Sequence, residues 1–233
     1  MRTIGLIGGM SWESTLSYYQ LINQGIKREL GGLHSAKLVL HSVDFAEIEH
    51  LQHLQHWQKL AEILIDAAMK LEAAGADCVA ICTNTMHKVA EQVENAISIP
   101  LLHIADATAK SLTPNQHFKV GLLGTQFTME QDFYKARLTE KFGIEVLIPT
   151  LMQRQRVHDV IYQELCLGNI QQASKQAFID VIHNLSERGA QAIILGCTEI
   201  ALLVNQGDTE IKLYDTTAIH AEFIVQFAVS KLD

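Results

Sequence analysis

The chain has 233 residues, of which 48% are hydrophobic and 19% charged, with 14 Gly and only 3 Pro. Its length fits one or two domains with a sizeable core, and its composition excludes global disorder, collagen-like sequence and linker-dominated sequence. With 18 basic and 26 acidic residues the net charge is −8. Nucleic acid, whose phosphates require a positive surface, is therefore not an expected partner.

The sequence carries no evident export or membrane signal. Its first ten residues are too short and too interrupted by glycine for the apolar segment of a signal peptide, and no run of about 18 apolar residues occurs. The four cysteines occur in a chain without an evident export signal, so a disulfide framework is not expected. We therefore expect a cytoplasmic protein with no membrane partner. The cysteines are Cys78, Cys82, Cys166 and Cys197.

Short apolar runs alternate with longer segments of helical period along the whole chain. Strands are predicted near residues 3–8, 37–43, 77–82, 100–104, 118–124, 144–148, 191–196 and 211–214. The run 191–196 is apolar without alternation, as expected for a parallel strand covered on both faces. Strands that alternate in this way with helices predict an α/β fold.

Helix boundaries are also marked in the sequence. The segment Thr128-Met-Glu-Gln131 predicts a capping box that opens a helix closed by Gly143. Gly75 and Gly189 each follow a long helical period. In the segment from Trp57, one helical face predicted to pack on a sheet is formed by Leu60, Ala61, Leu64, Ala67, Ala68 and Leu71.

The two halves of the chain resemble each other. The segment 4–8 is similar to 120–124, Cys82-Thr83 to Cys197-Thr198, and Asp106-Ala-Thr108 to Asp215-Thr-Thr217. The fold expected is therefore two pseudo-symmetric four-stranded parallel-sheet βα domains, residues 1–112 and 113–233, with the last helix free to pack back on the first half. Because parallel sheets bind ligands beyond the carboxyl ends of their strands, we expect the active site in a cleft between the domains.

Two of the four cysteines occupy positions suited to chemistry. Cys82 and Cys197 each end a predicted strand, are followed by Thr and precede a predicted helix start, where unpaired N–H groups and the helix dipole favour a thiolate. Cys78, inside a strand, is interpreted as a small core residue. Cys166 is interpreted as part of a helix face, with its end of the helix as a candidate border of the cleft.

A matched pair of thiols suits a reaction that is itself symmetric. Racemisation or epimerisation removes a proton from one face of a carbon and returns one to the other, which requires two sulfurs about 7 Å apart. The enolate that develops next to a carboxylate needs hydrogen-bond donors. The candidates are the backbone N–H groups at the two helix starts and the side chains of Thr83, Asn84, Thr85, Thr125 and Thr198.

Other chemistries fit the sequence less well. The segment Gly5-x-x-Gly8-Gly9 lacks the spacing of a dinucleotide-binding loop, and no phosphate-binding Gly-Lys-Ser/Thr motif occurs. The residues His50, His53 and His56 have helical spacing but no acidic partner pattern, so no metal site is expected. His87 lies about one helical turn beyond Cys82 and is interpreted as a structural or supporting residue, not as the base of a cysteine hydrolase.

At this point a family resemblance is evident. Gly8-Gly9-Met10, Cys82-Thr83-Asn84-Thr85 and Gly196-Cys197-Thr198-Glu199 resemble the cofactor-independent aspartate/glutamate racemase family over essentially the whole chain. The branch that is most similar is that of aspartate racemases and their broad-specificity amino-acid racemases, because Glu199 stands where glutamate racemases usually have His. Longer strings at 8–14 and 41–45 also look like the broad-specificity group.

The resemblance implies particular roles and partners. It implies two α/β domains related by a pseudo-twofold axis, no pyridoxal phosphate or other cofactor, a small amino-acid substrate and often a homodimer. Cys82 and Cys197 would be the paired acid and base. Thr83, Asn84 and Thr85 match the group that holds the substrate α-carboxylate. Thr198 with Glu199 matches the mirrored group, and Met10 matches a position in the first loop that lines the pocket.

Two departures from the family pattern bear on the substrate. Aspartate-specific members have an Arg after the second strand and a Lys before a later Gly-Asn, whereas this chain has Asp44-Phe-Ala-Glu-Ile-Glu-His50 and Leu165-Cys166-Leu167-Gly168-Asn169. An uncompensated substrate carboxylate is costly to bury, so we expect neutral or basic amino acids, with Gln52 in contact with their side chains. The alternatives are an aspartate racemase, a related single-thiol decarboxylase or isomerase, and a non-catalytic amino-acid-binding regulator.

Overall fold

The structure, a computed structural model, describes residues 1–230 and divides into two compact units. The first unit contains Met1–Ile104 and the end of the chain from His220, and the second contains Ala105–Ile219. The sequence predicts halves of 1–112 and 113–233, with the last helix free to pack back on the first half. In the structure helix α11, Thr216–Val229, supplies apolar residues to the core of the first unit.

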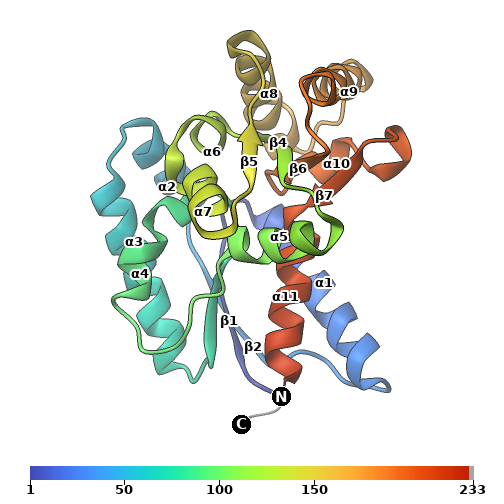
Figure 1. Ribbon diagram of the computed structural model, residues 1–233. Helices are drawn as coiled ribbons and strands as arrows, with labels where there is room; N and C mark the ends of the chain where they lie inside the picture. Colours follow the sequence, from blue (N-terminus) through green and yellow to red (C-terminus); the bar gives the residue numbers. More distant parts are fainter. Residues whose placement is uncertain (231–233) are drawn as a thin grey trace. The chain divides into compact units, whose positions relative to one another are not determined.

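The first unit is built on a parallel sheet with strand order β2-β1-β3, formed by β1 (Ile4–Gly8), β2 (Leu38–Ser42) and β3 (Cys78–Ile81). Helix α1 is Trp12–Leu30, and α1 and α11 run side by side against this sheet (Figure 1). The other elements, in chain order, are α2 (Phe45–His53), α3 (Trp57–Ala73), the 3₁₀ helix η1 (Thr85–Val89) and α4 (Ala90–Glu94).

Alternation along β1 fixes which helices cover each face of the sheet. Ile4 and Leu6 point into one core cluster with α1 and α11, whereas Ile7 points into a second cluster with α2, α3 and α4. All five residues of β1 are buried, as a strand covered on both faces requires. The buried face of α3 consists of the residues that the sequence predicted, Leu60, Ala61, Leu64, Ala67, Ala68 and Leu71.

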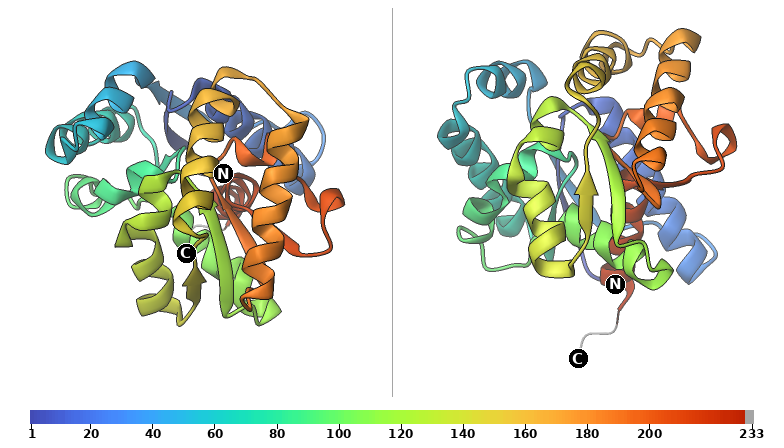
Figure 2. Two further views of the ribbon diagram at one scale, coloured as in Figure 1. Left: turned by 90° about the horizontal axis from the view of Figure 1, so that it is seen from above. Right: turned by 45° about the horizontal axis from the view of Figure 1, so that its top comes forward.

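The second unit repeats this plan with one strand more. Its parallel sheet has the order β5-β4-β6-β7, formed by β4 (Lys119–Gly124), β5 (Glu145–Leu147), β6 (Ala192–Gly196) and β7 (Lys212–Asp215). Helices α8 (Leu151–Gln163) and α9 (Gln172–Glu187) lie beside each other, and both contact β4 (Figure 2). The remaining elements are α6 (Gln126–Glu130), α7 (Asp132–Phe142), α10 (Ile200–Leu203) and the 3₁₀ helices η3 (Leu165–Leu167) and η4 (Gln206–Asp208).

One predicted strand is missing from the part of the chain that the structure describes. Near 100–104 only an isolated bridge joins Leu101 to Val79, so the first sheet has three strands and not four. Pro100 has no N–H to continue a ladder, and α5 (Ile104–Leu112), followed by the 3₁₀ helix η2 (Thr113–Asn115), begins only three residues after Leu101. The segment is too short to form a full strand.

The predicted capping box at Thr128-Met-Glu-Gln131 is also wrong. Thr125 caps α6, because its side-chain oxygen accepts a hydrogen bond from the N–H of Thr128 at 3.3 Å, and Thr128 lies inside that helix. Gly143 does end α7 in a left-handed conformation, at φ 68°. Gly75 and Gly189 follow α3 and α9 with positive φ, as the sequence predicted.

His220 of α11 is fully buried in the first unit and is held in its neutral form. Its Nε2 donates to the carbonyl oxygen of Leu102 at 2.6 Å, so Nδ1 is an acceptor for the hydroxyl of Tyr18 at 2.8 Å. The ring of His87 lies nearby, with ring centroids 6.0 Å apart. Burial lowers the pKa of His220 from 6.5 to about 4.

This histidine should make the stability of the protein depend on pH. Above pH 6.5 it is neutral in both states, but between pH 6.5 and about 4 the unfolded chain binds a proton that the folded chain does not. The free energy of unfolding should therefore fall by roughly 3 kcal/mol over this range from His220 alone. Urea unfolding across this range should show a shallower decline for His220→Gln. Equal slopes in the two proteins would contradict the assignment.

None of the helices formed by residues 1–230 is long and apolar enough to cross a membrane.

Candidate active site

The first half-site is formed where β3 ends. Cys82 directly follows the strand, its N–H donates to the carbonyl oxygen of Ile7 at 2.9 Å, and its side chain is fully buried. Ser14, in the first turn of α1, donates its hydroxyl to the carbonyl oxygen of Cys82 at 3.0 Å. Ser14 was not among the residues predicted from the sequence. The only local signal is its place in the first turn of α1, three residues after the N-cap Ser11. The backbone of Cys82 is therefore fixed from two sides.

The residues after Cys82 form a tight turn held by His87. The Nδ1 of His87 is 2.8 Å from the carbonyl oxygen of Thr83, and its Nε2 accepts the N–H of Ile104 at 3.2 Å. A carbonyl oxygen can only accept and an N–H can only donate, so His87 is neutral with its proton on Nδ1. It therefore supports the turn. Asn84 and Thr85, which the sequence selected as substrate donors, are buried in this turn.

The first loop, between β1 and α1, is also tightly fixed. Gly9 donates its N–H to the Thr15 hydroxyl at 2.8 Å, and Ser11 caps α1. Met10, the predicted pocket residue, is buried in this loop. Gln52 is buried on α2, and its amide donates to the sulfur of Met86 at 3.1 Å. The structure therefore places Gln52 beside the turn that contains Asn84 and Thr85.

The second half-site is formed where β6 ends. Cys197 directly follows this strand, and its Sγ–H donates to Oε2 of Glu199 at 3.0 Å. The same oxygen accepts the hydroxyl of Thr198 at 2.7 Å. Both Cys197 and Glu199 are buried. Thr216, which the sequence analysis did not select as a site residue, is buried and donates its hydroxyl to the carbonyl oxygen of Leu195 at 2.8 Å.

The thiols do not have the pKa direction that the sequence analysis expected. Burial raises the pKa of Cys82, and it raises the pKa of Cys197 well above its ordinary value, with further increases from the charges of Glu199 and Cys166. The helices that follow the two thiols are short, η1 with five residues and α10 with four, so their dipoles are small. Burial therefore outweighs the predicted helix effect.

Cys78 and Cys166 differ from this pair. Burial inside β3 raises the pKa of Cys78 to about 12, as suits the core residue that the sequence predicted. Cys166 is half-buried on η3 and close enough to Cys197 to affect its pKa. The sequence indicated a helix face for Cys166 and named the end of that helix as a candidate border of the cleft. Its proximity to Cys197 is not specified by any local pattern.

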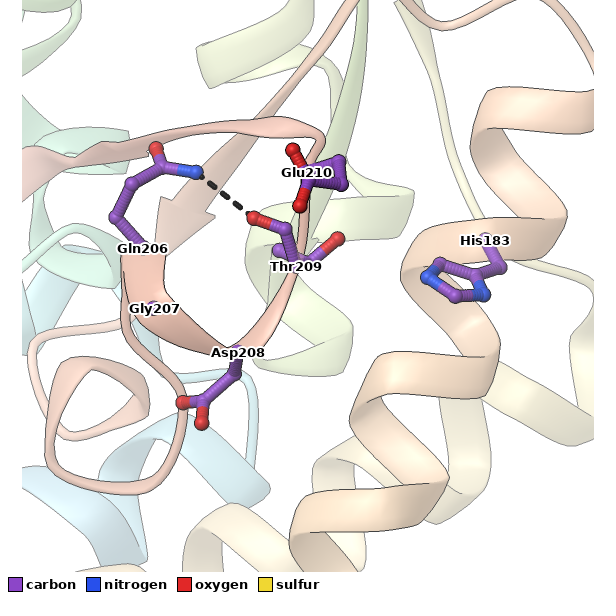
Figure 3. A pocket seen from close by; sticks show the side chains of 6 residues that line it. All are labelled: His183, Gln206, Gly207, Asp208, Thr209 and Glu210. Atoms are coloured by element: carbon purple, nitrogen blue, oxygen red, sulfur yellow. Dashed lines mark hydrogen bonds between the residues drawn. The ribbon is translucent and has the colours of Figure 1, made fainter.

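A separate pocket in the second unit involves none of the candidate residues. His183 of α9 faces the loop that precedes β7, where Gln206 donates to the carbonyl oxygen of Thr209 at 3.1 Å (Figure 3). The rest of the lining is Gly207, Asp208 and Glu210. Among residues 1–230, no three His, Cys, Asp or Glu side chains gather as a metal ion would require.

The two units of this α/β fold have the same core strand order. In each unit a buried thiol directly follows a strand that pairs with the unit's first strand. The family model for Asp/Glu/hydantoin racemases matches residues 7–224. The chain belongs to this racemase family and is an isomerase.

Individual relatives are consistent with that assignment. The broad specificity amino-acid racemase RacX of Bacillus subtilis (strain 168) is 29% identical over 72% of this chain and 71% of its own length. A Yersinia pestis protein assigned as an Asp/Glu racemase is 55% identical, with a TM-score of 0.93 over 99% of this chain and 100% of that one. An aspartate racemase homologue from Pyrococcus horikoshii OT3 is 35% identical, with a TM-score of 0.85 over the same shares.

Proposed function

We propose that the protein is an amino-acid racemase that works without pyridoxal phosphate, with Cys82 and Cys197 as its two acid–base groups. The observation that carries this proposal is the equivalent placement of the two thiols. Each is buried, directly follows the strand beside the first strand of its unit, and is followed by a threonine. A single-thiol reaction gives no reason for this duplication.

In the proposed reaction one cysteine, as thiolate, removes the Cα proton of the amino acid. The other cysteine, as thiol, returns a proton to the opposite face. One Cα–H bond breaks as an S–H bond forms on the first sulfur, and the reverse exchange occurs on the second, so protons balance. Burial of both thiols excludes water and strengthens the hydrogen bonds to the developing enolate. We assign these bonds to Thr83, Asn84, Thr85 and Thr125, and to the backbone N–H of Thr198, because the Thr198 hydroxyl already donates to Glu199.

We further propose that neutral or basic amino acids are the preferred substrates. Where aspartate-specific members have a cation after the second strand, this chain has the start of α2, with Asp44 as N-cap and Glu47 in the first turn. At the second expected position it has η3 with Cys166. The broad specificity of the RacX relative supports this range. The similarity to an aspartate racemase homologue supports aspartate as the rival substrate.

Single enantiomers incubated in D₂O without pyridoxal phosphate would test the activity. Deuterium at Cα and loss of optical rotation are expected with several neutral or basic amino acids. The value of kcat/KM for aspartate should be at least about 100-fold lower, because an uncompensated buried carboxylate costs several kcal/mol. Exchange with none of the amino acids would favour a binding protein, and release of CO₂ would favour a decarboxylase.

A gain-of-function variant sharpens the substrate test. Cys166→Lys places a cation close to Cys197 and should raise kcat/KM for aspartate relative to the unmodified protein, because it supplies the missing counter-charge. Alanine, which has no side-chain charge, is the matched control substrate. A kcat/KM for aspartate above that of every neutral amino acid in the unmodified protein would overturn the proposed range.

A further inference from the structure

The two half-sites differ at the residue two positions after each thiol. Cys82 is followed by Thr83 and Asn84, whereas Cys197 is followed by Thr198 and Glu199. Asn84 and Glu199 are both buried, with exposed fractions of 2% and 4%. A neutral amide in one half-site therefore corresponds to a carboxyl group in the other. The duplicated sequence is symmetric in its thiols but not in its charges.

The carboxyl group of Glu199 is in direct contact with the thiol. Its Oε2 accepts the Cys197 Sγ–H at 3.0 Å and the Thr198 hydroxyl at 2.7 Å. The Thr198 contact orients the carboxylate, because both donors meet the same oxygen. In this arrangement Cys197 is a thiol beside a carboxylate, and a thiolate at the same place would put two negative charges in a buried site.

The charge of Glu199 acts on one thiol of the pair. It is, after burial, the largest cause that raises the pKa of Cys197, whereas burial is the cause that raises the pKa of Cys82. For Cys197 to remove a substrate proton, it must first lose its own proton. That loss must not leave a Cys197 thiolate beside a Glu199 carboxylate, because the two negative charges would repel each other. The nearest acceptor is the oxygen to which the thiol already donates.

We infer that Glu199 is a positioning residue that accepts and stores the proton of Cys197 when Cys197 acts as the base. The Sγ–H bond breaks and an O–H bond forms on Glu199, which leaves a thiolate beside a neutral acid. The thiolate takes the Cα proton, and the Cys82 thiol gives its proton to the opposite face. When the product leaves and solvent water enters, the proton stored on Glu199 returns through that water to the Cys82 thiolate, which restores two thiols and one carboxylate.

This inference rests on the proposed racemase function, and it differs from the role that the family resemblance implied for Glu199. In that role Glu199 forms part of the group that binds the substrate. In the present inference its contact is the thiol, so its loss should affect the proton state of Cys197. The two roles therefore predict different results when the carboxylate is replaced by an amide of the same size.

The experiment compares Glu199→Gln with the unmodified protein in two measurements. The first is a pH titration of the ultraviolet absorbance of the Cys197 thiolate, obtained by subtracting the signal of the matching Cys197→Ser protein. The midpoint should move to lower pH in Glu199→Gln, because a negative charge beside the thiolate is gone. The second is kcat/KM for racemisation, which should fall about 100-fold, as expected for loss of a proton acceptor.

A substrate-binding role for Glu199 would raise KM, whereas loss of the proton acceptor lowers kcat with KM little changed. The thiol becomes a stronger acid while catalysis becomes slower. Glu199→Asp keeps a carboxylate and should recover part of the activity. Asp180→Asn removes an exposed carboxylate of α9 in the same unit and should change neither measurement. Thermodynamics supplies an internal check, since an equilibrium constant of one requires equal kcat/KM in the two directions for every variant.

Both results together support the inference. An unchanged titration midpoint or a midpoint at higher pH overturns it, even if activity falls, because Glu199 would then not govern the proton of Cys197. Unchanged kcat/KM also overturns it. Absence of racemisation in the unmodified protein would contradict the proposed function instead, and the titration would still report whether Glu199 is coupled to the thiol.

Discussion

Cys82→Ser and Cys197→Ser should each lower kcat/KM for racemisation by roughly 1,000-fold or more. A serine hydroxyl is a far weaker acid than a thiol, and each direction of racemisation needs both groups, one as base and one as acid. Because the two groups act as a unit, the double variant should be about as inactive as either single variant. Steady-state kinetics in both directions, from each enantiomer, would measure the losses.

Cys78→Ala is the matched control for these substitutions. Cys78 is a buried cysteine of the same segment and of the same core cluster as Cys82, but it is the first residue of β3, whereas Cys82 directly follows the end of that strand. This control should keep its activity and lose stability at most. Near-normal racemisation by either serine variant would require the two-base assignment to be abandoned.

Gly9→Ala should lower the free energy of unfolding by roughly 3 kcal/mol or more, because two separate costs add at this position. Gly9 has φ +91°, which an L side chain rarely adopts. A Cβ there would also overlap the carbonyl oxygen of Val43 and lie 2.8 Å from the Ser42 side chain. The loop could relieve the overlap only by moving, and its N–H contact with Thr15 would then be strained.

Gly75 provides the control for this prediction. It has a similar φ of +85°, but a Cβ there meets no atom within 4 Å. Gly75→Ala should therefore cost only about 1–2 kcal/mol, the conformational part alone. Urea unfolding of the two variants separates backbone strain from steric overlap. Equal losses in the two variants would show that the contact with Val43 adds nothing.

Most of the fold could be predicted from the sequence, because the strands β1, β3, β4 and β6 are almost fully buried and their apolar runs contrast sharply with the helices between them. Seven of the eight predicted strands form, within a residue or two of their expected bounds, and β1 and β4 are the central strands of the two corresponding sheets. The strand predicted near 100–104 does not form, because Pro100 lacks the N–H needed to extend the pairing. The prediction used only the apolar pattern of this segment and did not take the missing N–H of Pro100 into account.

Only those parts of the candidate site that depend on where strands end could be predicted from the sequence. The positions of Cys82 and Cys197 follow from where β3 and β6 stop, so the sequence located both thiols. Their pKa direction depends on burial, which is a property of the folded units and outweighed the predicted helix effect. The contacts of Ser14 with Cys82 and of Thr216 with Leu195 join residues far apart in sequence, so no local pattern could reveal them.

The path of the chain through its two units has a consequence for how the protein is made. The second unit is continuous, Ala105–Ile219, so all its residues are available before synthesis ends. The first unit is not, because Ala221, Ile224, Val225 and Ala228 of α11 complete the cluster around Ile4, Leu6 and Tyr18. On the ribosome, β1 and α1 emerge first but must wait for α11. The half of the chain that is synthesised first is thus the last to acquire its full core.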